Sequence, residues 1–344
     1  MTGTGRRFAV ATGTDAASGP EPLRWGVLGA SSTVARHAVV PALMTSPKAE
    51  VVATASLSGH VPAPGVRAHD SYEALLADPD VEAVYIPLPN HLHRPWTEKA
   101  AAAGKHVLCE KPLAPTAADA AAMAEACRDR KVLLAEAYMT PFHPRDRAVV
   151  EQVRRGRLGG VRHARSGFTF PLRDDANHRW RPECGGGALL DVGIYCLAPL
   201  VEIARRQPER VSATARMTAA GVDASFAALL DFGDGFAAHV WCSFELPERQ
   251  LLAIAGTAAT IEVEHAFTAG TDETGFDVEG VDGSTVAVES GGYDPYRGMV
   301  DHFQTVVRGG AALRRTPEDS VALLALLDRL RAAAETGTDP GPGR

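Results

Sequence analysis

The chain has 344 residues, more than a single hydrophobic core usually serves, so we expect two domains. It carries 35 Lys and Arg against 42 Asp and Glu, a formal net charge of -7, and has no long basic run, which excludes nucleic acid as an expected partner. We expect no membrane-spanning stretch of about 20 apolar residues. Residues 1–22 lack the apolar core of a secretory signal, which predicts a flexible leader on a cytoplasmic protein, and residues 337–344 are expected to form a flexible tail.

From residue 23 onwards, strand-like and helix-like segments alternate. The expected strands are 23–28, 50–55, 81–87, 106–109 and 132–136, and the expected helices are 34–44, 71–77, 93–103 and 116–130. Parallel strands need crossover connections, so this alternation predicts an α/β domain over 23–143, with a parallel sheet and helices on both faces.

The pattern changes after residue 143. A helix is expected at 145–155, and strands are expected at 227–232, 236–244, 250–255 and 260–263, with a hairpin turn at Gly233-Asp234-Gly235. Two helices follow at 294–307 and 317–336, the second capped by Thr316. Residues 144–336 are therefore predicted to form an α+β domain with an antiparallel sheet.

A candidate phosphate-binding turn connects the first strand to the first helix. Of the usual glycine pattern only Gly29 is present, because Ser31 and Val34 stand at the second and third glycine positions. Small residues still permit close approach of a ligand, and Ser32 and Thr33 add hydroxyl donors beside the helix N-terminus. These five residues are candidate dinucleotide ligands.

The end of the second strand bears on the choice of dinucleotide. An NAD enzyme commonly places an acidic residue here on the ribose 2′-hydroxyl, but the segment ends with Ser56 and Leu57. The Ser56 hydroxyl can hydrogen-bond to a 2′-phosphate without electrostatic repulsion, which favours NADP(H) and leaves NAD(H) possible. No metal site is expected, because the cysteines and histidines lack ligand spacing.

Two further motifs make the interpretation more specific: residues 85–93, Tyr-Ile-Pro-Leu-Pro-Asn-His-Leu-His, and residues 104–113, which contain Glu110-Lys111-Pro112. With the turn, they resemble the family of glucose-fructose oxidoreductase, inositol dehydrogenase and the rhizopine-catabolism proteins, from about residue 23 to about residue 336. The resemblance implies a Rossmann domain, a second domain with a large open sheet, mainly antiparallel, and a cis bond before Pro112. It also implies cofactor contacts at Leu88, Pro89, Asn90, His93, Glu110, Lys111, Trp180 and Arg181.

The resemblance extends to the glycine-rich stretch 185–195, which carries Asp191 and Tyr195. Tyrosine at this position is typical of the branch with glucose-fructose oxidoreductase, dihydrodiol dehydrogenase, xylose dehydrogenase and nucleotide-sugar ketoreductases. Hydride transfer to a ketone develops negative charge on oxygen, and we expect Lys111 to stabilise it and to lower the pKa of Tyr195. Either Lys111 or Tyr195 delivers the proton, and Asp191 binds a substrate hydroxyl or orients Lys111.

The leading hypothesis is thus an NAD(P)-dependent dehydrogenase or ketoreductase that acts on a sugar, polyol or nucleotide-linked sugar, in either direction. His143, Asn177 and Arg179 are further candidates for substrate contacts, beside Lys111, Asp191 and Tyr195. One alternative is a relative that retains and recycles its cofactor, in sugar–sugar exchange or glycoside cleavage. Another is a non-catalytic dinucleotide-binding sensor. The resemblance also implies a homodimer or homotetramer.

Overall fold

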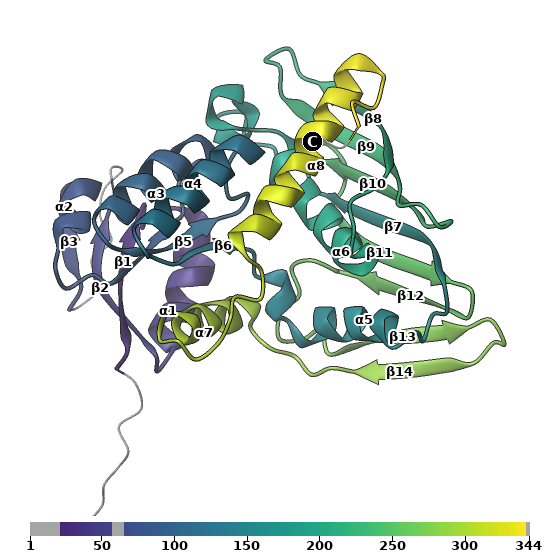
Figure 1. Cartoon of the computed structure of the whole chain (residues 1–344), viewed down its shortest axis with the longest axis horizontal. Coiled ribbons are helices and arrows are strands. Elements are labelled where there is room, and N and C mark those ends of the chain that lie inside the picture. Colours follow the sequence, from purple (N-terminus) through teal and green to yellow (C-terminus); the bar gives the residue numbers. More distant parts are fainter. Residues whose placement is uncertain (1–20, 57–64, 342–344) are drawn as a thin grey trace, which may run out of the picture.

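The computed structural model describes residues 21–56 and 65–341, which form two β-sheets with helices packed on them (Figure 1). The predicted leader lies, apart from residues 21 and 22, outside the described residues, as do Leu57 and the last three residues of the predicted tail.

The first sheet has six strands, all parallel, in the order β3-β2-β1-β4-β5-β6. They are β1 (Leu23–Leu28), β2 (Ala49–Ala55), β3 (Arg67–His69), β4 (Ala83–Ile86), β5 (His106–Glu110) and β6 (Leu134–Ala137). Five of these strands confirm the prediction to within three residues at each end. Strand β3 was not predicted, because three residues are too few to show an apolar pattern.

Helices cover both faces of this sheet (Figure 1). On one face lie η1 (Ala35–Val39), α1 (Val40–Thr45) and α7 (Pro295–Val307), and on the other lie α2 (Tyr72–Ala77), α3 (His93–Ala102) and α4 (Ala117–Asp129). The strand order reverses between β1 and β4, so the carboxyl ends of these two strands border a crevice of the kind that binds ligands in open α/β sheets. The first sheet is a Rossmann domain, as predicted.

The second sheet has eight strands in the order β14-β13-β12-β11-β7-β10-β9-β8. They are β7 (Val161–Thr169), β8 (Arg210–Met217), β9 (Asp223–Asp231), β10 (Ala237–Ser243), β11 (Arg249–Gly256), β12 (Ala259–Glu264), β13 (Gly275–Gly280) and β14 (Thr285–Glu289). Only β7 and β10 are parallel neighbours, so the sheet is mainly antiparallel, as predicted. The β9–β10 hairpin turns at Gly233, Asp234 and Gly235, all with positive φ.

One face of the second sheet is covered by α5 (Pro144–Arg154), by the π-helical turn η6 (Leu189–Gly193) and by α6 (Ile194–Ala204). The last two helices connect the two sheets. Helix α7 packs beside the first sheet, where Phe303 lies 5.0 Å from Trp25 between ring centroids, and α8 (Pro317–Thr336) packs on both α4 and β8. The C-terminal helices therefore do not belong to the second sheet alone, in contrast to the predicted unit 144–336.

One segment corrects the expectation that the chain has no stretch able to span a membrane. Pro182–Ala204 is long and apolar enough by composition, with a mean hydropathy of 1.7 in an 18-residue window. In the structure 78% of that window is buried inside the protein, between the second sheet and α5, so its apolar character matches that of a core helix.

Candidate active site

The turn after β1 has the geometry of an anion-binding loop. Gly29 has a φ of +90°, and a Cβ there would lie 2.7 Å from the side chain of Leu88, so glycine is needed at this position. Ser32 Oγ accepts a hydrogen bond from the Ala35 amide at 3.2 Å. The first amides of the following helix have no acceptor within the helix, which fits dinucleotide phosphates. Thr33 is exposed beside this turn, whereas Val34 is half-buried against the core.

Ser56 lies next to this turn. Its hydroxyl is 2.9 Å from the hydroxyl of Ser31, so the ends of β1 and β2 present two neutral hydroxyl groups at one place. Neither is acidic, and a 2′-phosphate would meet no negative side chain among residues 53–56. The hydroxyl groups of Ser31 and Ser56 therefore fit the 2′-phosphate of NADP better than the 2′-hydroxyl of NAD.

The opposite wall of the crevice is the loop after β4. Asn90, at the start of η2 (Asn90–Leu92), donates a hydrogen bond to the Gly185 carbonyl at 2.8 Å, which ties this loop to the glycine-rich stretch. Leu88 and Pro89 are half-buried beside it. His93 corrects a prediction. It is fully buried, and its ring nitrogens lie 2.7 Å from the Leu88 carbonyl oxygen and 2.9 Å from that of Pro112, so it supports the loop and cannot contact a cofactor.

The Glu110 side chain lies buried beneath the Lys111 backbone. The side chain is 7% exposed and accepts hydrogen bonds from the Tyr85 hydroxyl at 2.6 Å and from the Lys111 amide at 3.2 Å. Burial raises the pKa of Glu110. Glu110 therefore fixes the backbone of Lys111 from beneath, and its predicted contact with the cofactor stays a prediction. The Lys111–Pro112 peptide bond is cis, as the resemblance implies.

Lys111, Asp191 and Arg179 form a buried ionic cluster that we call the Lys111 clamp. Lys111 Nζ donates to Asp191 Oδ1 at 2.9 Å and to the Asp191 carbonyl at 2.7 Å, and Arg179 Nε donates to Asp191 Oδ2 at 2.7 Å. Burial alone would raise the pKa of Asp191, but the two cations lower it well below its usual range. The carboxylate is thus ionised, and two of the three Lys111 N–H groups are bound to one residue.

Tyr195 follows the clamp on α6 and contradicts one expectation. Burial raises the pKa of Tyr195 well above its usual value, whereas we expected Lys111 to lower it. The reason is geometric: Lys111 Nζ lies 4.9 Å from the centroid of the Tyr195 ring, while the hydroxyl contacts Met139 Sδ at 3.8 Å. The phenol therefore stays protonated at neutral pH.

Asn177 and Trp180 flank Arg179 in the short helical turn η4 (His178–Trp180). Asn177 Oδ1 accepts from the Arg179 amide at 3.1 Å, so its side chain caps this turn. Trp180 packs edge-on against Phe244 at 5.2 Å, and its indole nitrogen is buried with no hydrogen-bond partner among the described residues. Arg181 is exposed next to it. Asn177, Trp180 and Arg181 thus adjoin Arg179 of the clamp along the chain.

His143 is not near the clamp, which corrects its prediction as a substrate contact. It is 1% exposed and caps α5, where Nδ1 accepts from the Arg145 amide at 3.1 Å and Nε2 lies 2.9 Å from the Gly270 carbonyl oxygen. A histidine before a proline and a helix is a capping pattern that sequence reasoning could have recognised.

Two residues near Tyr195 were missed. Tyr138 and Met139 directly follow β6, at the same sheet edge as Lys111, and the Tyr138 ring lies 5.4 Å from that of Tyr195. Their position after a buried strand was the available signal. Across the described parts of the chain, no group of three or more His, Cys, Asp or Glu side chains is placed to hold a metal ion.

An ammonium group and a neutral phenol thus meet at the carboxyl edge of the Rossmann sheet, beside the phosphate-binding turn. Both can donate hydrogen bonds to an oxygen on which negative charge develops. This chemistry suits the reduction of a carbonyl or the oxidation of a carbinol by a bound dinucleotide.

Comparison with known families agrees with this geometry. A model described as an oxidoreductase family with an NAD-binding Rossmann fold matches residues 23–138, and a model of the GFO/IDH/MocA C-terminal domain matches residues 147–262. The chain is 36% identical over 323 residues to D-xylose 1-dehydrogenase (NADP⁺) 2 of Haloferax volcanii, covering 92% of this chain and 98% of that protein.

Solved structures are similar over almost the whole chain. A 3-ketoreductase from Actinomadura kijaniata in complex with NADP and TDP-benzene superposes with a TM-score of 0.83 and 30% identity, covering 91% of this chain and 98% of that one. The aldose-aldose oxidoreductase of Caulobacter crescentus, complexed with glycerol, has a TM-score of 0.83 and 25% identity, covering 92% and 98%.

Proposed function

The chain belongs to the GFO/IDH/MocA family of oxidoreductases, and from this premise we propose that it transfers hydride between NADP and a CH–OH carbon of a sugar, polyol or nucleotide-linked sugar. The observation that carries the proposal is the Lys111 clamp, which lies at the same sheet edge as the turn at Gly29. The protein is an NAD(P)-dependent dehydrogenase or ketoreductase, like its relatives.

The cofactor contacts are proposed from the two walls of the crevice. Ser31, Ser32, Thr33 and Val34 would hold the phosphates together with Gly29, and Ser56 would face the 2′-phosphate. Leu88, Pro89 and Asn90 would line the other wall, next to Lys111, and Trp180 and Arg181 would close the nicotinamide end. The nicotinamide supplies or accepts the hydride when it is bound.

The proton is proposed to come from Tyr195 in the reducing direction. Lys111 has one N–H group left for the substrate oxygen and is fixed by Asp191, so it stabilises the developing charge. Among the described residues the Tyr195 proton has only a weak sulfur acceptor, so it is available for transfer to the alkoxide. The raised pKa of Tyr195 keeps that proton in place until charge develops on the substrate.

The substrate would meet Lys111, Tyr195 and the outer side of Arg179. The guanidinium of Arg179 uses Nε for Asp191, and its side chain is 35% exposed, so its other N–H groups can bind neighbouring hydroxyl groups or a phosphate of a nucleotide-linked sugar. Asn177 would act on the substrate through Arg179, whose turn it caps.

The test is NADPH formation from NADP, followed at 340 nm with D-xylose and other aldoses, and NADPH consumption with keto-sugars. We expect turnover with at least one substrate and a loss of about 100-fold or more in Lys111→Met, with the dissociation constant for NADPH unchanged within about twofold. Turnover by Lys111→Met at the wild-type rate would refute the role of Lys111. Absence of any turnover, with dinucleotide bound, would favour the sensor alternative.

A second candidate function is sugar–sugar exchange, in which the cofactor stays bound and is recycled between two sugars. The similarity to an aldose-aldose oxidoreductase supports it. Denaturing the freshly purified protein distinguishes the two. Release of about one dinucleotide per chain, together with turnover of a sugar pair without added NADP, would favour recycling. Protein free of nucleotide that needs added NADP would favour the dehydrogenase.

We propose further that residues 23–143 form the nucleotide-binding domain. We also propose that the protein is a cytoplasmic homodimer or homotetramer. Its partner would be a small sugar-like molecule, and it would bind neither nucleic acid nor membrane. The face of the second sheet away from α6 supports the oligomer, because Leu229 is 60% exposed there and Trp241 lies half-buried beside it. Sedimentation velocity at micromolar concentration tests it, and a monomer would contradict it.

A further inference from the structure

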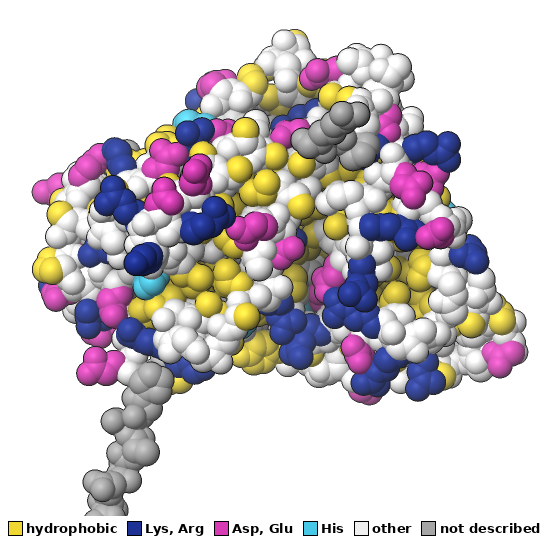
Figure 2. Space-filling model, viewed as in Figure 1, with side chains coloured by type: hydrophobic (Ala, Val, Ile, Leu, Met, Phe, Trp, Pro, Cys, Tyr) yellow, Lys and Arg dark blue, Asp and Glu magenta, His cyan; other side chains and the backbone are white. Residues whose placement is uncertain are grey.

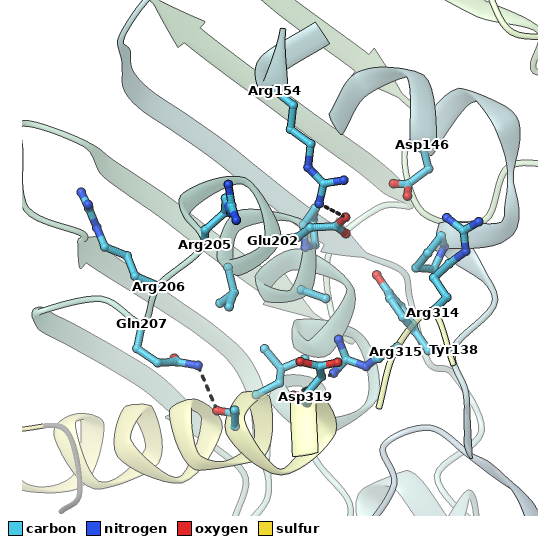
Figure 3. A pocket seen from close by; sticks show the side chains of 16 residues that line it. Tyr138, Asp146, Arg154, Glu202, Arg205, Arg206, Gln207, Arg314, Arg315 and Asp319 are labelled. Atoms are coloured by element: carbon cyan, nitrogen blue, oxygen red, sulfur yellow. Dashed lines mark hydrogen bonds and ion pairs between the residues drawn. The ribbon is translucent and has the colours of Figure 1, made fainter. Parts of the chain in front are cut away.

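A separate cavity lies between α5, the end of α6 and the start of α8 (Figure 3). Its volume is about 440 Å³, which is in the range of small-molecule sites. Arginine is the most frequent residue in its wall, with five side chains: Arg154, Arg205, Arg206, Arg314 and Arg315. Figure 2 shows Lys and Arg side chains on this part of the face, between α8 and α5. The residues that line the cavity belong neither to the phosphate-binding turn nor to the Lys111 clamp.

Two of these arginines have no acidic partner among the described residues. The guanidinium groups of Arg205 and Arg314 make no hydrogen bond or ion pair to any described residue, although Arg314 lies 5.5 Å from the Phe142 ring. By contrast, Arg154 pairs with Glu202 at 3.2 Å. Figure 3 shows Arg205 and Arg314 on opposite sides of the cavity. Planar guanidinium groups that face a cavity suit bidentate binding of phosphate.

The acidic groups in the wall do not neutralise this pair. Glu202 is bound by Arg154, and Asp319, which accepts hydrogen bonds from Thr316 in the capping box of α8, contributes one carboxylate against the five arginines of the wall. Burial and the neighbouring Glu202 raise the pKa of Asp146 to about 8, so Asp146 is largely uncharged at neutral pH. The cavity therefore keeps a net positive charge.

The cavity is also connected to the catalytic tyrosine. The hydroxyl of Tyr138 points into the cavity between Glu202 and Arg314 (Figure 3), while its ring packs 5.4 Å from the Tyr195 ring. Glu202 lies seven residues further along α6 than Tyr195, about 10 Å. A ligand in the cavity would thus touch both the side chain and the helix that position Tyr195.

We propose that this cavity is a second ligand site, which binds a small phosphate-bearing metabolite between Arg205 and Arg314, and that its occupancy reaches Tyr195 through Tyr138. Ligand binding in the cavity does not depend on the hydride-transfer proposal, because its residues take no part in cofactor or substrate binding, whereas the effect on Tyr195 rests on that proposal. A sugar phosphate fits its volume and its charge.

The test uses protein saturated with NADPH, so that phosphate groups cannot bind at the turn after β1. We would titrate it by calorimetry with glucose 6-phosphate, inorganic phosphate and glucose at constant ionic strength. Saturable binding of glucose 6-phosphate is expected, with at least tenfold weaker binding in the double variant Arg205→Ala/Arg314→Ala. The matched control is Arg130→Ala, an exposed arginine directly after α4, which should change neither binding nor kcat.

The outcomes separate the parts of the proposal. Binding of inorganic phosphate as tight as that of the ester means that the site recognises the phosphate group alone, and tighter binding of the ester means that the sugar is recognised too; both support the site. No binding to wild-type protein, or equal binding to the double variant, overturns it. An NADPH affinity equal to wild type shows that the double variant is folded.

The connection to Tyr195 has its own readout. Saturating glucose 6-phosphate should change kcat at least twofold in wild-type protein and leave kcat unchanged in the double variant. Tyr138→Phe, which keeps the ring and removes the hydroxyl from the cavity, should reduce the ratio of kcat with ligand to kcat without ligand, both measured on this variant. A kcat that does not respond to saturation would overturn this part.

Discussion

Replacement of Asp191 by asparagine tests whether this carboxylate holds Lys111 in place. The Asp191 side chain is 12% exposed and receives Lys111 Nζ at 2.9 Å and Arg179 Nε at 2.7 Å. Asp191→Asn keeps the shape and removes the charge. Lys111 and Arg179 then face each other across a neutral amide, in a site with little solvent.

The expected loss follows from burial. Removing one partner of a buried ion pair costs about 3–5 kcal/mol, because the other charge is left uncompensated. We expect the lower end, about 3 kcal/mol of unfolding free energy, because Arg179 is 35% exposed and can turn to solvent. Since Lys111 would lose its fixed position, kcat should fall by about 100- to 1,000-fold.

Urea unfolding followed by tryptophan fluorescence measures the first effect, and turnover at saturating NADP measures the second. Glu262→Gln is the matched control, because Glu262 pairs with Arg165 at 3.2 Å with both side chains about half exposed, and an exposed pair contributes about 0–1 kcal/mol. If Asp191→Asn loses no more stability than this control, or keeps kcat within threefold, the clamp does not act as we describe.

The remaining predictions concern pH, the catalytic tyrosine and the cofactor. Lys111 and Arg179 lower the pKa of Asp191 in the folded state, so stability is full above about pH 4 and falls as the pH drops further; acid unfolding should be shallower in Asp191→Asn. Tyr195→Phe should lower kcat by about 100-fold or more while NADPH binds within twofold of wild type, as a fluorescence titration would show. Gly29→Ala forces a Cβ against Leu88 at positive φ, so we expect about 1–3 kcal/mol of lost stability in urea and weaker NADPH binding. Ser56→Asp should weaken NADPH at least tenfold and leave NADH unaffected or tighter, and equal weakening of both would show that Ser56 does not face the 2′-phosphate.

The sequence predicts most of the first domain, because its strands are apolar runs separated by helices of ordinary length. It predicts less of the second sheet. Strand β8 alternates polar residues with small or apolar ones, since one face is open, and β13 and β14 lie in a glycine-rich stretch that resembles a loop. The return of α7 to the first sheet could not be predicted, because an amphipathic helix does not reveal its partner.

The candidate site, too, is predicted only in part from the sequence. The motifs locate Lys111, Asp191 and Tyr195, and the structure brings them together. The motifs do not distinguish residues that face the crevice from residues that support it, so His93 was expected at the cofactor but is fully buried beneath the loop after β4. The pKa of Tyr195 depends on burial in three dimensions, which residue spacing along the chain cannot give.

The most direct test of the account is a titration of the nucleotide-free protein with NADPH and with NADH, followed by quenching of tryptophan fluorescence. Trp180 lies at the proposed nicotinamide end of the crevice, so bound NADPH should quench it and accept its excitation. We predict saturable binding of NADPH, with NADH at least tenfold weaker. Binding of neither dinucleotide, to protein that also releases none on denaturation, would contradict the account.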